Sequence, residues 1–188
     1  MMDFPGSYQR PIERVVLLGF MCSGKSTVGE SLARRLGWSF VDFDVEIEKV
    51  EQRPVWEIIE SRGEEYFRAL EADLTEAASQ QRYLVMAPGG AWITRPELLD
   101  RLRVGTLSIR LMVSPEETVR RLREDSIARP LRDEVDPTGT VAAMMADREQ
   151  LYRLADVAVP AEGRSVEDIA FEIEQVVRTR RSAFGLAT

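Results

Sequence analysis

A glycine-rich loop, set between an apolar run and a helical pattern, constrains the fold of this chain more than any other feature. Residues 19–26 read Gly-Phe-Met-Cys-Ser-Gly-Lys-Ser, which fits the pattern G-x-x-x-x-G-K-[ST]. The continuous apolar run at 15–18 predicts a strand buried on both faces. Apolar residues at helical spacing within 25–36 predict a helix. A strand, a tight loop and a helix in this order predict a phosphate-binding loop within an α/β fold.

The residue types in this loop suit the binding of a triphosphate. Its glycines let backbone N–H groups point inward and cradle phosphate oxygens, and the following helix adds its dipole. Lys25 would reach the β- and γ-phosphates, and the hydroxyl of Ser26 would ligate Mg²⁺. We expect ATP to contact Gly19, Met21, Cys22, Ser23, Gly24, Lys25, Ser26 and Thr27. Cys22 is interpreted as a packing residue, with a reactive thiol as the alternative.

The scarcity of lysine narrows the class of nucleotide-binding protein. Only two of the 25 basic residues are lysines, Lys25 and Lys49. Lys49 lies in Glu-Lys-Val-Glu, so the chain lacks the Asn-Lys-x-Asp element with which a GTPase reads guanine. The predicted strand at 83–87 ends in Pro-Gly-Gly and not in the Asp-Glu of motor and AAA-type ATPases. A small-molecule kinase is therefore favoured.

Composition excludes several other functions. The formal net charge is −7, which argues against a protein that binds nucleic acid or a membrane surface. The chain has no histidine, which removes histidine-based acid–base catalysis and histidine-ligated metals. Its single cysteine excludes internal disulfides. Residues 1–14 lack the apolar stretch of a signal peptide, so we expect a cytoplasmic location.

Short β-rich runs alternate with helical patterns, which predicts a single α/β domain, 1–188, with a mostly parallel sheet. The predicted strands are 15–18, 39–41, 83–87, 106–113 and 157–159. The predicted helices are 25–36, 55–61, 64–80, 96–102, 115–123, 140–154 and 165–181. Residues 126–139 are charged, contain Pro130 and Pro137 and show little periodicity, so they are predicted to form a mobile loop.

Further motifs follow the phosphate-binding loop in a set order. They are Asp42-Phe43-Asp44, Gly-Glu-Glu-Tyr-Phe-Arg at 63–68 with Glu71, Gly89-Gly90, Arg129-Pro130-Leu131, and Arg148 followed by Leu151-Tyr152. In order and spacing, across about 15–177, this set resembles the shikimate kinase family. The resemblance implies a three-layer fold with a five-stranded parallel sheet flanked by helices, a substrate-binding insert at about 43–71 and a lid at about 123–139. It also implies a monomer that uses ATP and Mg²⁺ to phosphorylate the 3-hydroxyl of shikimate, a carboxylated polyol.

The resemblance assigns a role to each matching residue. Asp42 would join the Mg²⁺ shell, and Asp44 would orient or deprotonate the attacking substrate hydroxyl. If the chain stays extended beyond the second strand, period-two spacing puts both carboxylates on one side. An acidic helix cap at Asp44 is the alternative. The substrate-binding set is Asp44, Arg68, Gly89, Gly90 and Arg148, and the catalytic set is Lys25, Asp44 and Arg129.

The arginines carry three separate expectations. Arg68 and Arg148 would hold the substrate carboxylate, although salt bridges on solvated helix faces are the alternative. Glu71, three residues after Arg68, is close enough to hold its guanidinium. Arg129 of the lid would contact phosphate. Arg121 is assigned to the adenine side of the ATP site, where Arg120 and Arg123 are hard to separate from it.

The chain departs from the family pattern at four positions near the substrate. They are Ile59, where an aromatic residue often lines the pocket, and Pro88, Ala91 and Trp92 around the glycine pair. A related kinase for an aminoshikimate-type analogue or gluconate is therefore the alternative function. A nucleotide-binding regulatory module without catalysis is a third, against which the retained site residues argue.

Overall fold

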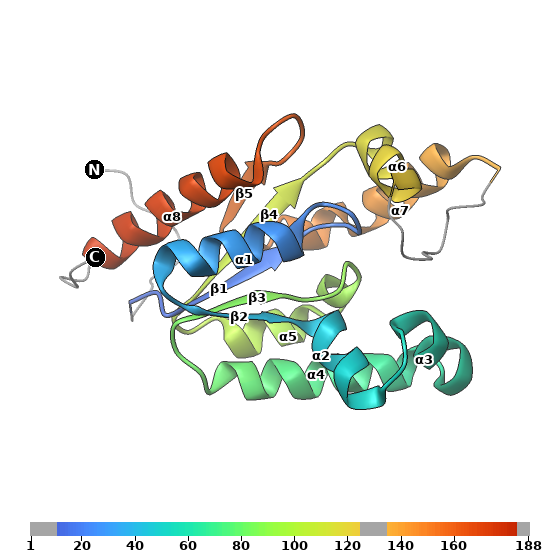
Figure 1. The fold of residues 1–188 in the computed structure, drawn as a ribbon, viewed down its shortest axis with the longest axis horizontal. Helices are drawn as coiled ribbons and strands as arrows, with labels where there is room; N and C mark the ends of the chain where they lie inside the picture. Colours follow the sequence, from blue (N-terminus) through green and yellow to red (C-terminus); the bar gives the residue numbers. More distant parts are fainter. Residues whose placement is uncertain (1–10, 125–134, 184–188) are drawn as a thin grey trace.

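The computed structural model describes residues 11–124 and 135–183 (Figure 1). Its strands form one sheet in the order β2-β3-β1-β4-β5, and every neighbouring pair is parallel. The strands are β1 (Arg14–Leu18), β2 (Ser39–Asp42), β3 (Leu84–Ala87), β4 (Thr106–Met112) and β5 (Val157–Pro160). The predicted parallel sheet is therefore confirmed, and the order places β1, which leads into the phosphate-binding loop, at its centre.

Helices cover both faces of the sheet (Figure 1). They are α1 (Lys25–Leu36), α2 (Phe43–Glu51), α3 (Val55–Arg62), α4 (Glu64–Ser79), α5 (Pro96–Leu102), α6 (Pro115–Glu124), α7 (Pro137–Tyr152) and α8 (Val166–Ser182), with a 3₁₀ turn, η1 (Trp92–Thr94). Helices α1 and α8 pack on one face, and α4 and α5 lie on the other. This arrangement confirms the three-layer α/β fold.

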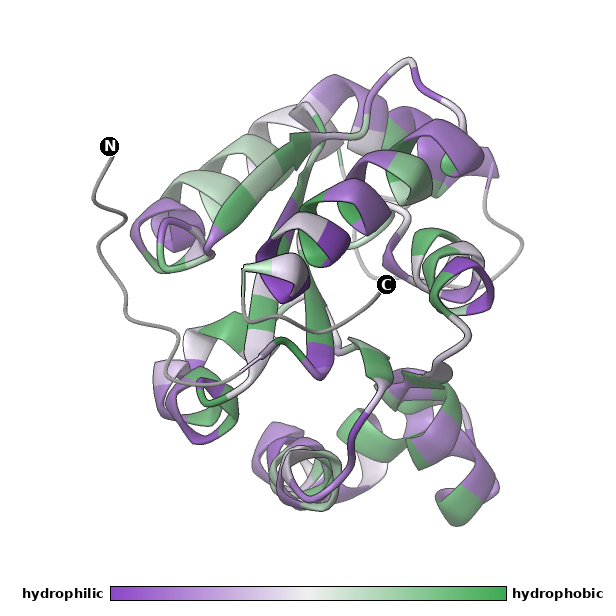
Figure 2. Cartoon of the chain, turned by 90° about the vertical axis from the view of Figure 1, so that its left-hand side faces the viewer, coloured by the Kyte–Doolittle hydropathy of each residue, from purple (hydrophilic) through white to green (hydrophobic). Residues whose placement is uncertain are grey.

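The sequence of β1 explains why both faces are covered. All of its residues are buried, and successive side chains point to opposite faces of the sheet. Val15 and Leu17 pack into the cluster formed with α1 and α8. Val16 and Leu18 pack into the cluster formed with α4 and α5. Figure 2 shows mostly hydrophobic strands between helices in which hydrophilic and hydrophobic residues are mixed.

The segment after β2 differs from the extended geometry considered for the two aspartates. Helix α2 begins at Phe43, directly after the strand, and Oδ1 of Asp42 accepts a hydrogen bond from the N–H of Val45 at 3.3 Å. Asp42, and not Asp44, is therefore the helix cap. The chain does not stay extended beyond β2, because a carboxylate that accepts a hydrogen bond from a helix N–H favours the start of a helix at the next residue.

The predicted loop at 126–139 also ends earlier than expected. Helix α7 begins at Pro137 and not at residue 140, and Oδ1 of Asp136 accepts from the N–H of Gly139 at 2.9 Å. Proline is well tolerated at the first position of a helix, so Pro137 opens α7 where it was taken to mark a loop. The remainder of this loop and most of the predicted lid lie outside the described residues.

Loops at the carboxyl ends of β1, β2 and β3 meet at one edge of the sheet, where ligands bind in open parallel sheets. The predicted phosphate-binding and glycine-pair motifs begin in the loops after β1 and β3, whereas the aspartate motif spans the last residue of β2 and the first turn of α2. None of the helices in residues 11–124 and 135–183 is long and apolar enough to cross a membrane.

Candidate active site

The phosphate-binding loop joins β1 to α1 and leaves the start of that helix open. Gly24, the N-cap of α1, has φ 93°, a left-handed conformation that glycine adopts without strain. No side chain caps α1, and its first turn contains no acidic residue. Nζ of Lys25 donates to the carbonyls of Gly19 and Phe20 at 3.0 and 3.1 Å. An uncapped helix start beside an ammonium group suits an anion with several oxygens.

Ser26 and Asp42 form the part of this loop that suits a metal ion. The hydroxyl of Ser26 donates to Oδ2 of Asp42 at 2.5 Å. No group of three or more histidine, cysteine or acidic residues that could hold a metal occurs in the described part of the chain. Mg²⁺ commonly takes one or two protein oxygens and completes its shell with water and phosphate oxygens. This hydroxyl–carboxylate pair therefore fits Mg²⁺ that is shared with a nucleotide.

Asp44 and Glu71 bring two carboxylates to the glycine pair from different helices. A side-chain carbon at position 89 would lie 2.7 Å from Oε1 of Glu71 and 3.2 Å from Oδ1 of Asp44. Glu71 is fully buried, and burial raises its pKa, a rise that the charge of Arg68 opposes and that of Asp44 reinforces. Of the two carboxylates, Asp44 lines the cleft described below, whereas Glu71 is enclosed in the protein next to Gly89.

Arg68 is held by two glutamates of its own helix. Its Nη1 donates to Oε2 of Glu71 at 2.5 Å, and its Nη2 donates to Oε1 of Glu64 at 2.7 Å. The predicted pairing with Glu71 is therefore confirmed. Nη1 of Arg95 donates to the carbonyl of Arg68 at 3.1 Å, a contact that the sequence did not indicate. The Arg68 side chain is 15% exposed and cannot be described as an ordinary solvated salt bridge.

Arg148 approaches the other glycine of the pair. Its Nη1 donates to the carbonyl of Gly90 at 3.4 Å, and its guanidinium lies 5.3 Å from the ring centroid of Phe20 in the phosphate-binding loop. Gly90 itself rests on that loop, because a Cβ there would lie 2.9 Å from the backbone nitrogen of Met21. The N–H groups of Gly89 and Gly90 donate to no acceptor in the described part of the chain. Their contact with a substrate stays a prediction.

Among the three neighbouring arginines of α6, Arg121 faces the phosphate-binding loop. Its Nη1 donates to the carbonyl of Cys22 at 3.2 Å, and its Nη2 donates to the carbonyl of Ala161 at 3.1 Å. Arg120 instead pairs with Glu117 and Glu124 on the exposed side of α6. Hydrogen bonds from Arg120 and Arg121 lower the pKa of Glu117 to about 2. Glu117 therefore stays ionised and orients Arg121.

One cleft of about 450 Å³ joins the phosphate-binding loop to the aspartate and glycine-pair loops. Its lining includes Met21, Cys22, Gly24, Lys25, Ser26, Thr27, Asp42, Asp44, Ala87, Pro88, Gly90, Arg121 and Glu124. Gly19 and Ser23 lie within the same loop. Arg68 is connected to this region by Glu71, which accepts its hydrogen bond and lies, like Asp44, next to Gly89. Arg129 lies outside the described residues.

The four departures from the family pattern have different surroundings. Pro88 lines the cleft, and Ala91 follows the glycine pair. Trp92 is fully buried in the core, where its Nε1 donates to Oγ1 of Thr75 at 3.0 Å, so it does not line the cleft. Ile59 packs against a small cluster of residues from α2, α3 and α4.

Sequence reasoning did not assign a role to Tyr152, the last residue of α7. Its hydroxyl donates to the carbonyl of Gly90 at 3.0 Å. Tyr152 follows Arg148 by four residues, a spacing that places both side chains on one face of a helix. This spacing of four residues is the sequence signal that could have indicated a role for Tyr152 beside Arg148.

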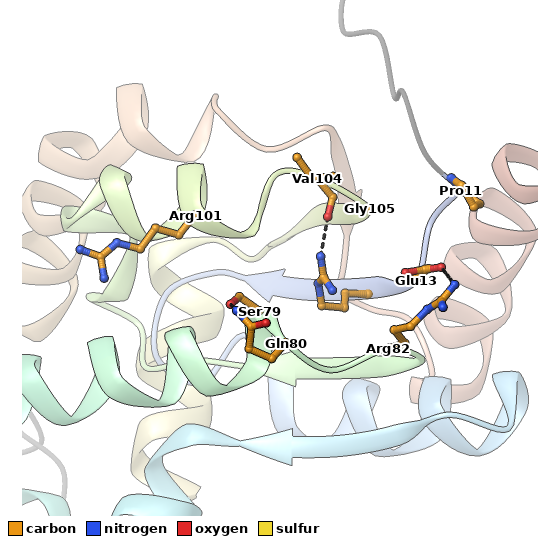
Figure 3. A pocket seen from close by; sticks show the side chains of 9 residues that line it. Pro11, Glu13, Ser79, Gln80, Arg82, Arg101, Val104 and Gly105 are labelled. Atoms are coloured by element: carbon orange, nitrogen blue, oxygen red, sulfur yellow. Dashed lines mark hydrogen bonds and ion pairs between the residues drawn. The ribbon is translucent and has the colours of Figure 1, made fainter.

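A second cleft, of about 540 Å³, lies at the opposite end of the sheet, before β1 (Figure 3). Arg14 closes its inner wall: Nη1 donates to the carbonyl of Gln81 at 2.7 Å, Nε to Oγ1 of Thr106 at 3.0 Å, and Nη2 to the carbonyl of Val104. Arg82 at its rim pairs with Glu13. These groups join the segments that follow α4 and α5, so this cleft has a structural explanation.

The family model and the curated relatives indicate one family. The family model described as shikimate kinase matches residues 21–178. The shikimate kinase of Geobacter metallireducens is 40% identical over 162 residues, which cover 86% of this chain and 90% of that relative. A solved structure of shikimate kinase from Acinetobacter baumannii in complex with shikimate has a TM-score of 0.82 and 30% identity, and covers 89% of this chain and 94% of that one. A gluconokinase from Sinorhizobium meliloti shares the fold, with a TM-score of 0.62, 19% identity, and coverage of 96% of this chain and 100% of that one.

Proposed function

Because the chain belongs to the shikimate kinase family, we propose that it transfers the γ-phosphoryl group of ATP to the 3-hydroxyl of shikimate. The observation that carries this proposal is that Lys25, Asp44 and Gly90 line the same cleft. A phosphate donor on the loop and a hydroxyl beside Asp44 would meet inside it. Phosphoryl transfer depends mainly on such positioning and on neutralising charge.

The donor side of the reaction uses the loop and the start of α1. Backbone N–H groups of the loop would hold the phosphates, and Lys25 would neutralise charge on the transferring group. Mg²⁺, which Ser26 and Asp42 are suited to hold, would supply further charge neutralisation at the phosphate oxygens. Arg121 donates hydrogen bonds to Glu117 and to the carbonyl of Cys22, and it would lie at the adenine side of the ATP site.

The acceptor side uses Asp44 and the two arginines around the glycine pair. Asp44 would accept the proton of the attacking hydroxyl or orient that hydroxyl. Arg68 and Arg148 flank Gly89 and Gly90 and would bind the shikimate carboxylate, a group that suits a guanidinium fork. The N–H groups of the two glycines would donate to the same ligand. Arg129 is proposed to add a phosphate contact from the lid.

We further propose that the protein acts as a monomer in the cytoplasm. All of the proposed site residues belong to one chain, so a second copy is not required to complete the site. The partner is a small molecule, and the net charge of −7 gives no support to nucleic acid.

A coupled assay of ADP release tests the proposal with shikimate, an aminoshikimate-type analogue and gluconate as acceptors, in the presence of ATP and Mg²⁺. Shikimate should accelerate ADP release and yield a phosphate monoester detectable by ³¹P NMR. No acceleration by shikimate would contradict the proposal. Acceleration by gluconate that survives both Arg68→Ala and Arg148→Ala would favour the alternative kinase. Absence of transfer to all acceptors in a single-turnover assay would favour a regulatory module.

A further inference from the structure

Tyr152 is fixed inside the protein at both ends of its side chain. The residue is 3% exposed and packs into the core cluster that contains Trp92 and Leu18. The guanidinium of Arg110, on β4, lies 4.9 Å from the centroid of its ring. Arg110 is itself held by two hydrogen bonds to Glu149, at 3.1 and 2.7 Å. These contacts hold the Tyr152 ring in place, so its hydroxyl keeps a fixed position beside the Gly90 carbonyl.

The Gly90 carbonyl receives two donors from the same face of α7. The Tyr152 hydroxyl donates at 3.0 Å, and Nη1 of Arg148 donates at 3.4 Å. The arginine bond is the longer of the two. Its guanidinium also lies over the ring of Phe20, so it stands between the glycine pair and the phosphate-binding loop. Only one of the two donors, Arg148, belongs to the proposed carboxylate-binding set.

We propose that Tyr152 is a positioning residue: its hydroxyl keeps the Gly90 carbonyl hydrogen-bonded so that Arg148 can turn to the carboxylate of the substrate. This inference rests on the proposed function. A partly buried carbonyl that loses its last donor is costly, whereas one that keeps a second donor is not. In a chain without the Tyr152 hydroxyl, Arg148 could bind the carboxylate only by leaving the carbonyl without a partner. The cost would appear as weaker binding of shikimate.

The test is Tyr152→Phe, which removes the hydroxyl and keeps the ring. We expect the KM and the directly titrated Kd for shikimate to rise about 5- to 30-fold, the factor that corresponds to one buried hydrogen bond. The KM for ATP should change by less than about twofold, because the nucleotide contacts do not use this carbonyl. Tyr83→Phe is the matched control: Tyr83 is 43% exposed at the other end of β3, and its variant should behave as the unaltered protein.

A double-mutant cycle with Arg148→Ala separates positioning from simple support of the fold. If Tyr152 acts through Arg148, then Tyr152→Phe should add little to the loss already caused by Arg148→Ala. An unchanged shikimate KM in Tyr152→Phe would overturn the inference. So would losses that add fully, or equal rises in both KM values with a lowered Tm, since these indicate structural support alone.

Assays of a destabilised variant can be run in the cold with saturating ATP, which stabilises the folded state by mass action. A wild-type protein that does not phosphorylate shikimate would instead refute the proposed function, and the inference with it.

Discussion

Arg68→Ala should destabilise the folded protein in a way that depends on pH. The substitution removes the guanidinium that donates to Oε2 of Glu71 at 2.5 Å. Glu71 is fully buried and also feels the charge of Asp44, so its carboxylate would be left buried beside a like charge, with Arg95 as the remaining opposite charge. Breaking a buried ion pair by removing one partner costs about 3–5 kcal/mol. Because Arg68 keeps 15% of its side chain exposed, we expect a loss of about 3 kcal/mol near neutral pH.

The sign of the pH dependence follows from Glu71. Burial raises its folded-state pKa above the ordinary value of 4.5, and Arg68 opposes this rise. Without Arg68 the folded-state pKa rises further, so the folded state holds the proton more tightly than the unfolded state does. The protonated form therefore supports stability fully below the unfolded-state pKa, and this support is lost as the pH rises through the folded-state pKa. The variant should be closer to wild type at about pH 5 than at about pH 8.

Urea denaturation followed by circular dichroism measures this effect at several pH values. Arg103→Ala is the matched control, because Arg103 pairs with Asp100 at 2.8 Å while both side chains are more than 60% exposed (62% and 63%). It should change the free energy of unfolding by less than about 0.5 kcal/mol, with no pH trend. Adding Glu71→Gln to Arg68→Ala should recover most of the loss at high pH. A loss of equal size at about pH 5 and about pH 8 would refute the reasoning.

Two further predictions concern Asp42, the proposed metal ligand, and the second cleft. Asp42→Asn should raise the Mg²⁺ concentration needed for half-maximal activity roughly 10- to 100-fold while helix content stays constant, because asparagine still caps α2; a titration of activity with Mg²⁺ measures the shift, and an unchanged midpoint would contradict it. Arg14→Ala should lower the free energy of unfolding by about 2–4 kcal/mol and leave kcat unchanged, because it strips donors from the carbonyls of Gln81 and Val104 at the end of the sheet remote from the site. The exposed rim residue Arg101 gives the control variant, Arg101→Ala, whose unfolding curve should match the wild type.

Features encoded within a few neighbouring residues were predictable from the sequence. The buried run of β1, the glycine-rich loop and Lys25–Leu36 are continuous in the chain, so one local pattern specifies them. The pairing of Arg68 with Glu71 follows from their spacing on a helix. The start of α2 was missed although its signals were local, because Asp42 was weighed only as a metal ligand and not as a cap for Val45.

Contacts between separate elements were not predictable in the same way. Arg110 and Glu149 are 39 residues apart, and their pairing depends on how α7 packs against β4. The bond from Tyr152 to Gly90 spans 62 residues and depends on how α7 packs against the segment between β3 and η1. Neither residue type nor spacing identifies such partners, because many arginines and glutamates in this chain could have paired.

Arg68 and Arg148, the two arginines proposed to bind the substrate, differ in the charge of their partners. Arg68 donates to the carboxylates of Glu64 and Glu71, which already neutralise its charge. Within the described residues, Arg148 contacts the Gly90 carbonyl, the Phe20 ring and the Tyr152 side chain, and none of these partners is a carboxylate. A neutral carbonyl orients a guanidinium without cancelling its charge, so Arg148 retains more attraction for a substrate carboxylate than Arg68 does. In a chain with a net charge of −7, we therefore expect attraction for an anion to depend on which cations keep their charge, and the proposed role of Tyr152 is to hold the Gly90 carbonyl when Arg148 turns to that anion.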